Sequence, residues 1–258
     1  MLDLSRDNPR WARTIAACFV AGITVIGFVV GWLFGAAIIG AVASFVVAGI
    51  VAWLSFAAGD RILLARAGAH PVTPDKEPRL YNIAEGLSIA SGLPKPALLV
   101  VEDPALNAFA TGIDPKHASL VVTRGLLDSL NRMELEGVLG HELAHIQNRD
   151  TLVMQVASTL LGSLLPLGVL FMPSALSRDR ESAADINGAR YTRYPIGLRT
   201  ALQKLAEGGT ALRRRSRGTA GMWIASPLKG GDGLSGWLDK RFDSHPSLEE
   251  RINLLEDL

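Results

Sequence analysis

The sequence predicts a mainly α-helical protein with a small β-sheet, preceded by a helical hairpin that crosses a membrane twice. The hairpin is predicted by residues 14–59, which contain no charged side chain. The helices are predicted by apolar side chains at helical spacing, and the sheet by short runs rich in β-branched residues. We expect residues 1–66 to form a membrane anchor and residues 67–258 to form the functional domain.

The uncharged N-terminal stretch is long enough for two spans. One span needs about 20 apolar residues, so we place the spans near Trp11–Gly31 and Ala36–Ala57, with a turn at Gly31–Gly35. A cleaved signal peptide does not fit, because the first apolar run is too long and a second follows at once. Arginines flank both outer ends but not the turn: Arg6, Arg10, Arg13, Arg61 and Arg66. The positive-inside rule therefore predicts a multi-pass protein of the cell (inner) membrane with a cytoplasmic functional domain.

Composition narrows the function further. The net charge of +1 predicts no nucleic-acid partner. The single cysteine, Cys18, excludes an internal disulfide, and its apolar surroundings predict a side chain that faces lipid or the core. A chain of 258 residues has room for one domain with a sizeable core beside the membrane segments.

The functional domain starts with a predicted helix and sheet. Pro71–Pro78 is a linker rich in proline and charge, and an amphipathic helix is expected over residues 80–90. Strands are expected over residues 97–101, 108–113 and 119–123. These strands would form a small sheet beside the helix that follows.

The helix predicted over residues 131–148 carries the most informative motif, and an approximate capping-box spacing opens it. His141 and His145 are four residues apart, so they share a helix face and can bind one metal ion. Glu142 lies next to that face, where it can take a proton from a metal-bound water. The motif therefore predicts zinc-assisted hydrolysis of a peptide bond. The simpler alternative is a chance match, with His141 a buried core histidine and His145 on the surface.

A catalytic zinc site usually has three protein ligands and one water, so a third ligand must be found. The sixth residue after His145 is Thr151, so a third histidine is not available there. A distant carboxylate must serve, and the candidates are Glu181 and Asp179. We favour Glu181, because Asp185 follows it by one helical turn and can accept a hydrogen bond from the far nitrogen of a ligating histidine.

The third hydrophobic stretch, residues 151–177, is also uncharged. A single crossing would place Glu181 across the bilayer from the two histidines, and two crossings would need about 40 residues. We therefore expect a bent helical hairpin that dips into the cytoplasmic leaflet, with a continuous buried helix as the alternative. The bend is expected at Gly162, Pro166 and Gly168.

The C-terminal part is predicted to contain two helical regions joined by a long loop. A helical region is expected over residues 190–207, interrupted near Pro195, and an amphipathic helix over residues 248–258. The loop between them contains arginines that either contact anionic lipid headgroups or are solvated. Its apolar segment Met222–Ile224 is expected either to pack on the domain or to rest on the membrane.

Four stretches of the chain, in this order, resemble the HtpX-like membrane zinc metalloproteases, which are gluzincin-type enzymes related to the CAAX prenyl proteases. They are residues 107–112, the His141–His145 motif running on to Asn148 and Asp150, Arg180-Glu181 with Ala184-Asp185, and Ser244-His245-Pro246 followed by Glu250-Arg251-Ile252. The resemblance covers nearly the whole chain. Two features depart from it: Ser182 replaces the usual aromatic residue, and the stretch 151–177 is shorter than in members with two spans there.

The resemblance implies an α+β zincin-like catalytic domain with one zinc ion per chain, bound by His141, His145 and Glu181. It implies that Glu142 is the general base, and that Asn107 and His245 polarise the scissile carbonyl or stabilise the oxyanion. An exposed sheet edge would hold the substrate as an added strand.

The implied activity is that of an endopeptidase that cleaves misfolded or damaged membrane proteins at the lipid bilayer. The alternative is a membrane-anchored zinc-binding scaffold or regulator without peptidase activity. Structural zinc sites fill all four positions with protein ligands. The sequence offers three good ligands and an adjacent glutamate, which favours the enzyme.

Overall fold

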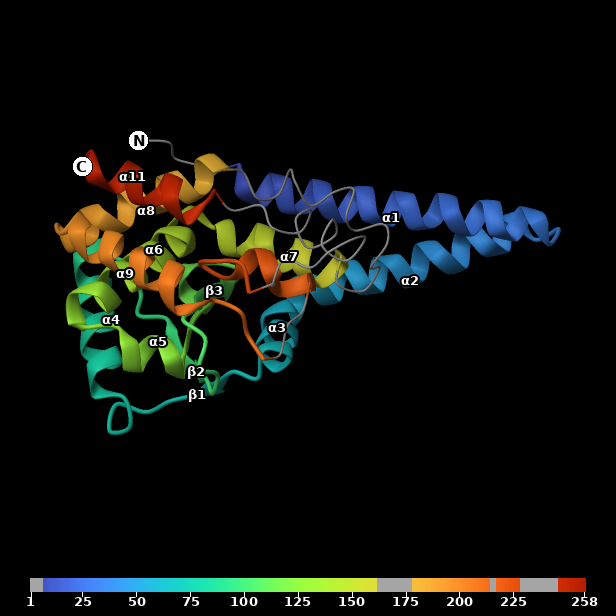
Figure 1. The fold of residues 1–258 in the computed structure, drawn as a ribbon. Coiled ribbons are helices and arrows are strands. Elements are labelled where there is room, and N and C mark those ends of the chain that lie inside the picture. Colours follow the sequence, from blue (N-terminus) through green and yellow to red (C-terminus); the bar gives the residue numbers. More distant parts are fainter. Residues whose placement is uncertain (1–6, 162–177, 214–216, 228–245) are drawn as a thin grey trace.

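The computed structural model describes residues 7–161, 178–213, 217–227 and 246–258. Two long helices, α1 (Asn8–Leu33) and α2 (Ala37–Ala57), form a hairpin that projects from the rest of the molecule (Figure 1). Both are long and apolar enough to cross a membrane. They touch at two glycines, because a Cβ on Gly40 would lie only 2.3 Å from the carbonyl oxygen of Gly27. The predicted hairpin is therefore present, and α1 is longer than the span expected for it.

The other helices surround a small sheet (Figure 1). In chain order they are α3 (Gly59–Ala67), α4 (Pro78–Ser91), α5 (Arg124–Ser129), α6 (Arg132–Asn148), α7 (Asp150–Leu161), α8 (Arg178–Thr192), α9 (Pro195–Gly208) and α11 (Leu248–Glu256). Short 3-10 turns lie at η1 (Pro115–His117) and η4 (Arg217–Met222). The break expected near Pro195 separates α8 from α9, which begins with that proline as helices often do.

The sheet has the strand order β1-β2-β4-β3, formed by β1 (His70–Pro71), β2 (Ala97–Val101), β4 (Ala118–Thr123) and β3 (Ala108–Gly112). Strands β2 and β4 are parallel, and the other two pairs are antiparallel. Val121 pairs with Leu99 on one side and with Phe109 on the other. The three longer strands agree with the predictions to within one residue at each end. The two-residue strand β1 could not be predicted, because a histidine and a proline carry no strand pattern.

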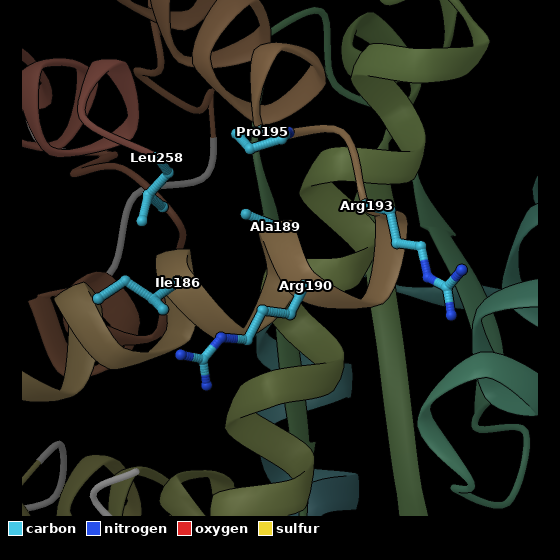
Figure 2. A pocket seen from close by; sticks show the side chains of 6 residues that line it. All are labelled: Ile186, Ala189, Arg190, Arg193, Pro195 and Leu258. Atoms are coloured by element: carbon cyan, nitrogen blue, oxygen red, sulfur yellow. The ribbon is translucent and has the colours of Figure 1, made fainter.

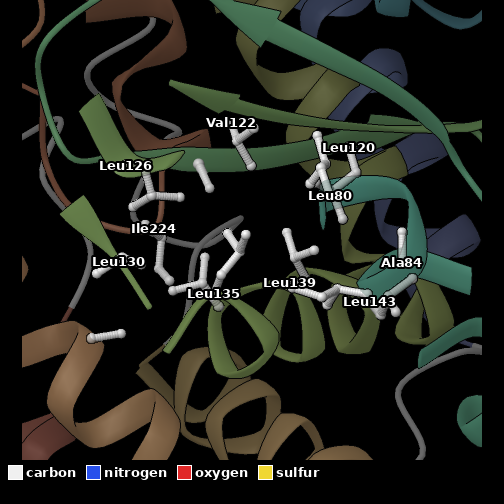
Figure 3. Close-up of a cluster of buried hydrophobic side chains, with 14 of the residues drawn as sticks. Leu80, Ala84, Leu120, Val122, Leu126, Leu130, Leu135, Leu139, Leu143 and Ile224 are labelled. Carbon is white, nitrogen blue, oxygen red and sulfur yellow. The ribbon is translucent and has the colours of Figure 1, made fainter. Parts of the chain in front are cut away.

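The main core lies between the sheet and α6. Figure 3 shows Leu135, Leu139 and Leu143 on one face of α6, directed toward Leu120 and Val122 of β4. All five side chains are buried, and each contributes about 1.5–3 kcal/mol relative to an exposed position. The rest of the α6 surface contacts α4, α8 and α9. Because α6 is packed on several sides, the backbone positions of His141, Glu142 and His145 are fixed. The fold class predicted from the sequence is confirmed.

The third hydrophobic stretch begins as α7, which follows α6 after one residue. Arg149 makes this corner with a left-handed backbone (φ 58°). Helix α7 packs against the base of the hairpin, where Val153 and Val156 meet Ala12 of α1 and Ala52 of α2. The bend expected at Gly162, Pro166 and Gly168 lies outside the described residues, so the choice between a bent hairpin and a continuous helix stays a prediction.

The apolar segment Met222–Ile224 packs on the domain. Trp223 is buried edge-on against Phe109 of β3, with ring centroids 4.6 Å apart. The Ile224 N–H donates to the carbonyl oxygen of Ala108 over 2.8 Å. The outer edge of β3 is therefore paired at Ala108, because burial of this segment brings its backbone onto the strand. The expected binding of substrate at an exposed sheet edge stays a prediction.

Candidate metal centre and active site

Helix α6 positions the histidine motif, and its start is fixed by local hydrogen bonds. The Glu134 N–H donates to Asn131 Oδ1 over 3.0 Å, and the Asn131 N–H donates to Glu134 Oε2 over 2.8 Å. This reciprocal pair is the capping box expected from the sequence. The helix then runs without interruption through His141, Glu142 and His145, all of which are buried.

Helix α8 crosses α6 and brings a carboxylate to the two imidazoles. His141 Nε2 and His145 Nε2 are 3.1 Å apart. Glu181 Oε2 lies 3.6 Å from His141 Nε2, and Glu181 Oε1 lies 3.5 Å from His145 Nε2. Tetrahedral metal sites with bonds of about 2.0–2.1 Å place neighbouring ligand atoms about 3.3 Å apart. The three side chains therefore have the separation that a single tetrahedral ion requires, and they form a candidate metal site.

A second layer of carboxylates orients both imidazoles. His141 Nδ1 lies 2.8 Å from Asp185 Oδ1, and His145 Nδ1 lies 3.0 Å from Asp150 Oδ2. An ionised carboxylate only accepts hydrogen bonds, so each Nδ1 carries a proton and each Nε2 is turned toward the other ring. Asp185 was expected in this place. The corresponding role of Asp150 was missed, although an acidic residue five positions after His145 at a helix end was the available signal.

The side chains present fit a metal ion. Two imidazole nitrogens and a carboxylate that converge within 3.1–3.6 Å need positive charge between them, which either a proton on His145 or a metal ion supplies. Two histidines and one glutamate are also an established ligand set for catalytic zinc, with the fourth position left for water. Buried carboxylates that hold the far ring nitrogens are the usual partners of such ligands.

Arg251 of α11 completes the buried cluster and was given no role by the sequence. Its guanidinium donates to both oxygens of Asp185, over 2.9 and 2.8 Å. Its Nη1 lies 3.6 Å from Glu181 Oε2 and donates to the carbonyl oxygen of Ile224 over 2.6 Å. An arginine on a short amphipathic helix normally points to solvent, so its burial could not be predicted from the helical pattern alone.

The charged groups around the two histidines shift their pKa values in opposite directions. Burial and the charge of Arg251 lower the pKa of His141 to about 4. Burial alone would lower the pKa of His145 as well, but the charge of Glu181 and the hydrogen bond and charge of Asp150 raise it to about 9. His141 is therefore neutral with a lone pair available, while the carboxylates favour positive charge at His145, which a metal ion would also supply. Burial would raise the pKa of Asp185, but Arg251 lowers it overall.

Two other candidates from the sequence are not among the candidate ligands, and the structure does not describe a third. Asp179 is exposed, whereas Glu181 is buried in the cluster. The amide of Asn107 is buried and donates to the carbonyl oxygens of Ala225 and Thr210, over 2.8 and 3.1 Å. Among the described residues the candidate ligand set does not include Asn107, so its role as a polarising group stays a prediction. His245 lies outside the described residues.

A separate cavity of about 410 Å³ opens beyond the cluster, where α8 ends and α9 begins (Figure 2). It is lined by Ile186, Ala189, Arg190, Arg193, Pro195 and Leu258. These side chains do not belong to the candidate metal site, so the cavity and the metal site are distinct features of the described chain.

A helix-borne His-Glu-x-x-His motif joined to a glutamate from a second helix, on a chain with two apolar N-terminal helices, defines a membrane metallopeptidase. Comparison with known families supports this class. The family model described as peptidase family M48 matches residues 74–173 and 164–258. The chain belongs to peptidase family M48.

Relatives cover this chain almost completely. A protease HtpX homolog of Caldanaerobacter subterraneus subsp. tengcongensis is 33% identical, over 100% of this chain and 98% of that protein. A homolog of Dictyoglomus thermophilum is 37% identical over 84% of this chain and 81% of its own. One of Pyrococcus furiosus is 33% identical over 96% of each chain. The resemblance to HtpX-like proteases is therefore confirmed, and the chain is a membrane metalloprotease.

A solved structure was also found to be similar. The crystal structure of S. mikatae Ste24p is 16% identical, with a TM-score of 0.45, and the match covers 99% of this chain and 66% of that chain.

Proposed function

We propose that this protein is an integral-membrane zinc endopeptidase whose zinc ion is held by His141, His145 and Glu181. The observation that carries the proposal is the convergence of the two Nε2 atoms and the Glu181 carboxylate within 3.1–3.6 Å of one another. Asp185 and Asp150 lie at the far nitrogens, as the outer partners of metal-binding histidines usually do, and this supports the proposed metal site.

The remaining side chains of the cluster supply proton transfer and positioning. Zinc, when bound, acts as a Lewis acid and lowers the pKa of its water to about 7. Glu142 is buried beside the cluster, and its charge acts on both His145 and Arg251. It accepts the proton of the attacking water and passes it to the leaving amine. Arg251 holds Asp185, and through it the ring of His141, in a fixed orientation.

The location of the site supports a cytoplasmic protease that works at the membrane surface. The arginines at both outer ends of the hairpin favour a cytoplasmic position for the domain. Helix α7 leads from the motif helix directly to the base of the hairpin. Misfolded or damaged membrane proteins would expose peptide bonds near the membrane surface, close to the base of the hairpin. We propose these proteins as the substrates and quality control of membrane proteins as the role.

The test uses the full chain purified in detergent, with casein as substrate. Wild type should lose casein cleavage when zinc is chelated and regain it when zinc is returned. Glu142→Gln should bind zinc normally but cleave no casein, because the ligands are intact and the base is lost. The matched control is Glu136→Gln on the same helix, outside the metal cluster, which should cleave like wild type.

Two outcomes would overturn the assignment. Casein cleavage at the wild-type rate by Glu142→Gln would show that Glu142 is not the base. Full zinc occupancy in Glu181→Ala would move the third ligand to Asp179 or Asp185. For the proposed substrates, a destabilised membrane protein in mixed micelles should be cleaved faster than its folded parent, and equal rates would contradict the proposed quality-control role.

A further inference from the structure

The first residue of the membrane hairpin, Asn8, points into the catalytic domain. Its side chain is fully buried at the start of α1. The amide of Asn8 donates to the carbonyl oxygen of Asn148 over 2.7 Å and to Asp150 Oδ1 over 2.8 Å. An asparagine at a helix start usually bonds its own first turn, but both bonds found here cross to residues that are 140 and 142 positions away.

Both partners of Asn8 belong to the support of one candidate metal ligand. Asp150 accepts from Asn8 on Oδ1, while its Oδ2 lies 3.0 Å from His145 Nδ1. Asn148 is the last residue of α6, one turn after His145, and its carbonyl is among those left without a partner inside the helix. Asn8 therefore holds the carboxylate that orients the imidazole and also the end of the helix that carries it.

We propose that Asn8 is a positioning residue for His145, so that the membrane hairpin is a structural part of the metal site and not only an anchor. This inference rests on the proposed zinc site and extends it. A carboxylate bonded through both oxygens keeps one rotamer. Without the Asn8 amide, Asp150 Oδ1 keeps the Arg180 guanidinium, whose Nη1 lies 3.8 Å away and beyond hydrogen-bond distance. The carboxylate is then held less firmly, and so is the ring of His145. Metal sites lose affinity when the outer partners of their ligands are removed.

The packing around Asn8 holds the membrane hairpin in a fixed position on the catalytic domain. Beyond Asn8, α1 buries Ala12 and Ala16 against Leu152 and Val156 of α7. The second hairpin helix is tied in separately, since Gln155 Nε2 donates to the carbonyl oxygen of Ser55 in α2 over 3.0 Å. A shift or tilt of the hairpin relative to the domain would therefore reach His145 through Asn8 and Asp150.

The test measures metal binding in the full chain, so it does not depend on catalysis. Asn8→Ala should weaken zinc affinity roughly tenfold, the lower end of the range for outer partners of metal ligands. It should also change the visible absorption spectrum of the cobalt-substituted site, which a loss of stability alone would not do. The matched control is Thr24→Val on the same helix. Among the described residues, the Thr24 hydroxyl donates only to the carbonyl oxygen of Val20, so this variant should leave both readouts unchanged.

A second comparison tests whether Asn8 acts through Asp150. In the Asp150→Asn background, Asn8→Ala should cause a smaller loss of zinc affinity than in wild type, because the link through Asp150 is already broken and only the bond to the Asn148 carbonyl remains to be lost. If alanine prevents folding, Asn8→Asp has nearly the same volume and removes the amide donor, and it should weaken zinc affinity as well. Wild-type zinc affinity in whichever variant folds, or independent losses in the double variant, would overturn the positioning role. Absence of zinc binding by wild type would instead refute the proposed function itself.

Discussion

The contact between α6 and α8 gives the sharpest prediction about the active site. The helices meet where Gly188 of α8 lies on the backbone of the histidine motif. A Cβ added at Gly188 would lie 2.6 Å from His141 N and 2.9 Å from Gly140 C. These are backbone atoms that cannot move aside, so Gly188→Ala must push the helices apart.

The size of the displacement follows from these distances. Ordinary contact starts at 3.4 Å, so relief of the 2.6 Å contact needs a separation of about 0.8 Å. Glu181 lies on α8 about two turns before Gly188, and it faces the histidines of α6 at 3.5–3.6 Å. Ligand distances in metal sites tolerate about 0.2 Å. We expect Gly188→Ala to weaken zinc binding and to lower the cleavage rate by up to about 10²-fold.

The assay compares Gly188→Ala with Gly86→Ala in casein cleavage and in zinc content after dialysis. Gly86 is an exposed position in α4, and a Cβ there would meet no atom within 4 Å. Gly86→Ala should therefore be neutral in both assays, or stabilise the chain by about 0.4–1 kcal/mol. If Gly188→Ala keeps the wild-type rate and zinc content, the two helices do not set the ligand geometry as argued.

Three further predictions concern the buried cluster and its surroundings. Arg251→Met should lower the free energy of unfolding by about 3–5 kcal/mol in zinc-free protein, because it leaves Asp185 buried without its cation. Thermal unfolding in detergent measures this loss. The control is Arg199→Met, which removes a partly exposed ion pair with Glu256 and should lower the free energy of unfolding by less than about 1 kcal/mol. Because the pKa of His145 is raised to about 9, zinc must displace its proton below that pH. Zinc affinity should therefore rise about tenfold per pH unit from neutral pH toward 9, as measured by chelator competition, and a flat profile would contradict the pKa. Trp223→Ala should destabilise the domain by about 3–5 kcal/mol in the same unfolding assay, because the ring is buried against Phe109; a loss under 1 kcal/mol would show that this segment is not packed as described.

The sequence predicted the parts of the fold that depend on local pattern. The uncharged N-terminal stretch, the three longer strands and the capped motif helix all have local signals, and the structure has them close to the expected bounds. The choice of Glu181 over Asp179 also came from local spacing, because only Glu181 has a carboxylate one turn ahead. The structure places Glu181 in the cluster and leaves Asp179 exposed.

The parts that escaped prediction depend on contacts between distant segments. Arg251 lies in one of the four stretches that resemble the protease family. No local pattern, however, indicates that its side chain or that of Asn8 is buried next to a histidine motif more than 100 residues away. The pairing of Ile224 with Ala108 could not be predicted either, because it joins a strand to a loop with no strand pattern. Such contacts follow from the packing of whole helices, which a local pattern does not encode.

The wide spacing of the cluster along the chain bears on how the enzyme is made. The hairpin leaves the ribosome before the domain that follows it, and it can enter the bilayer while that domain is still being translated. The motif helix follows, but Asp185 gains its guanidinium partner only when position 251 has been synthesised and α11 has docked. The growing polypeptide therefore lacks a finished catalytic centre for most of its synthesis. A chain of this design can therefore enter the membrane before its candidate metal site is complete.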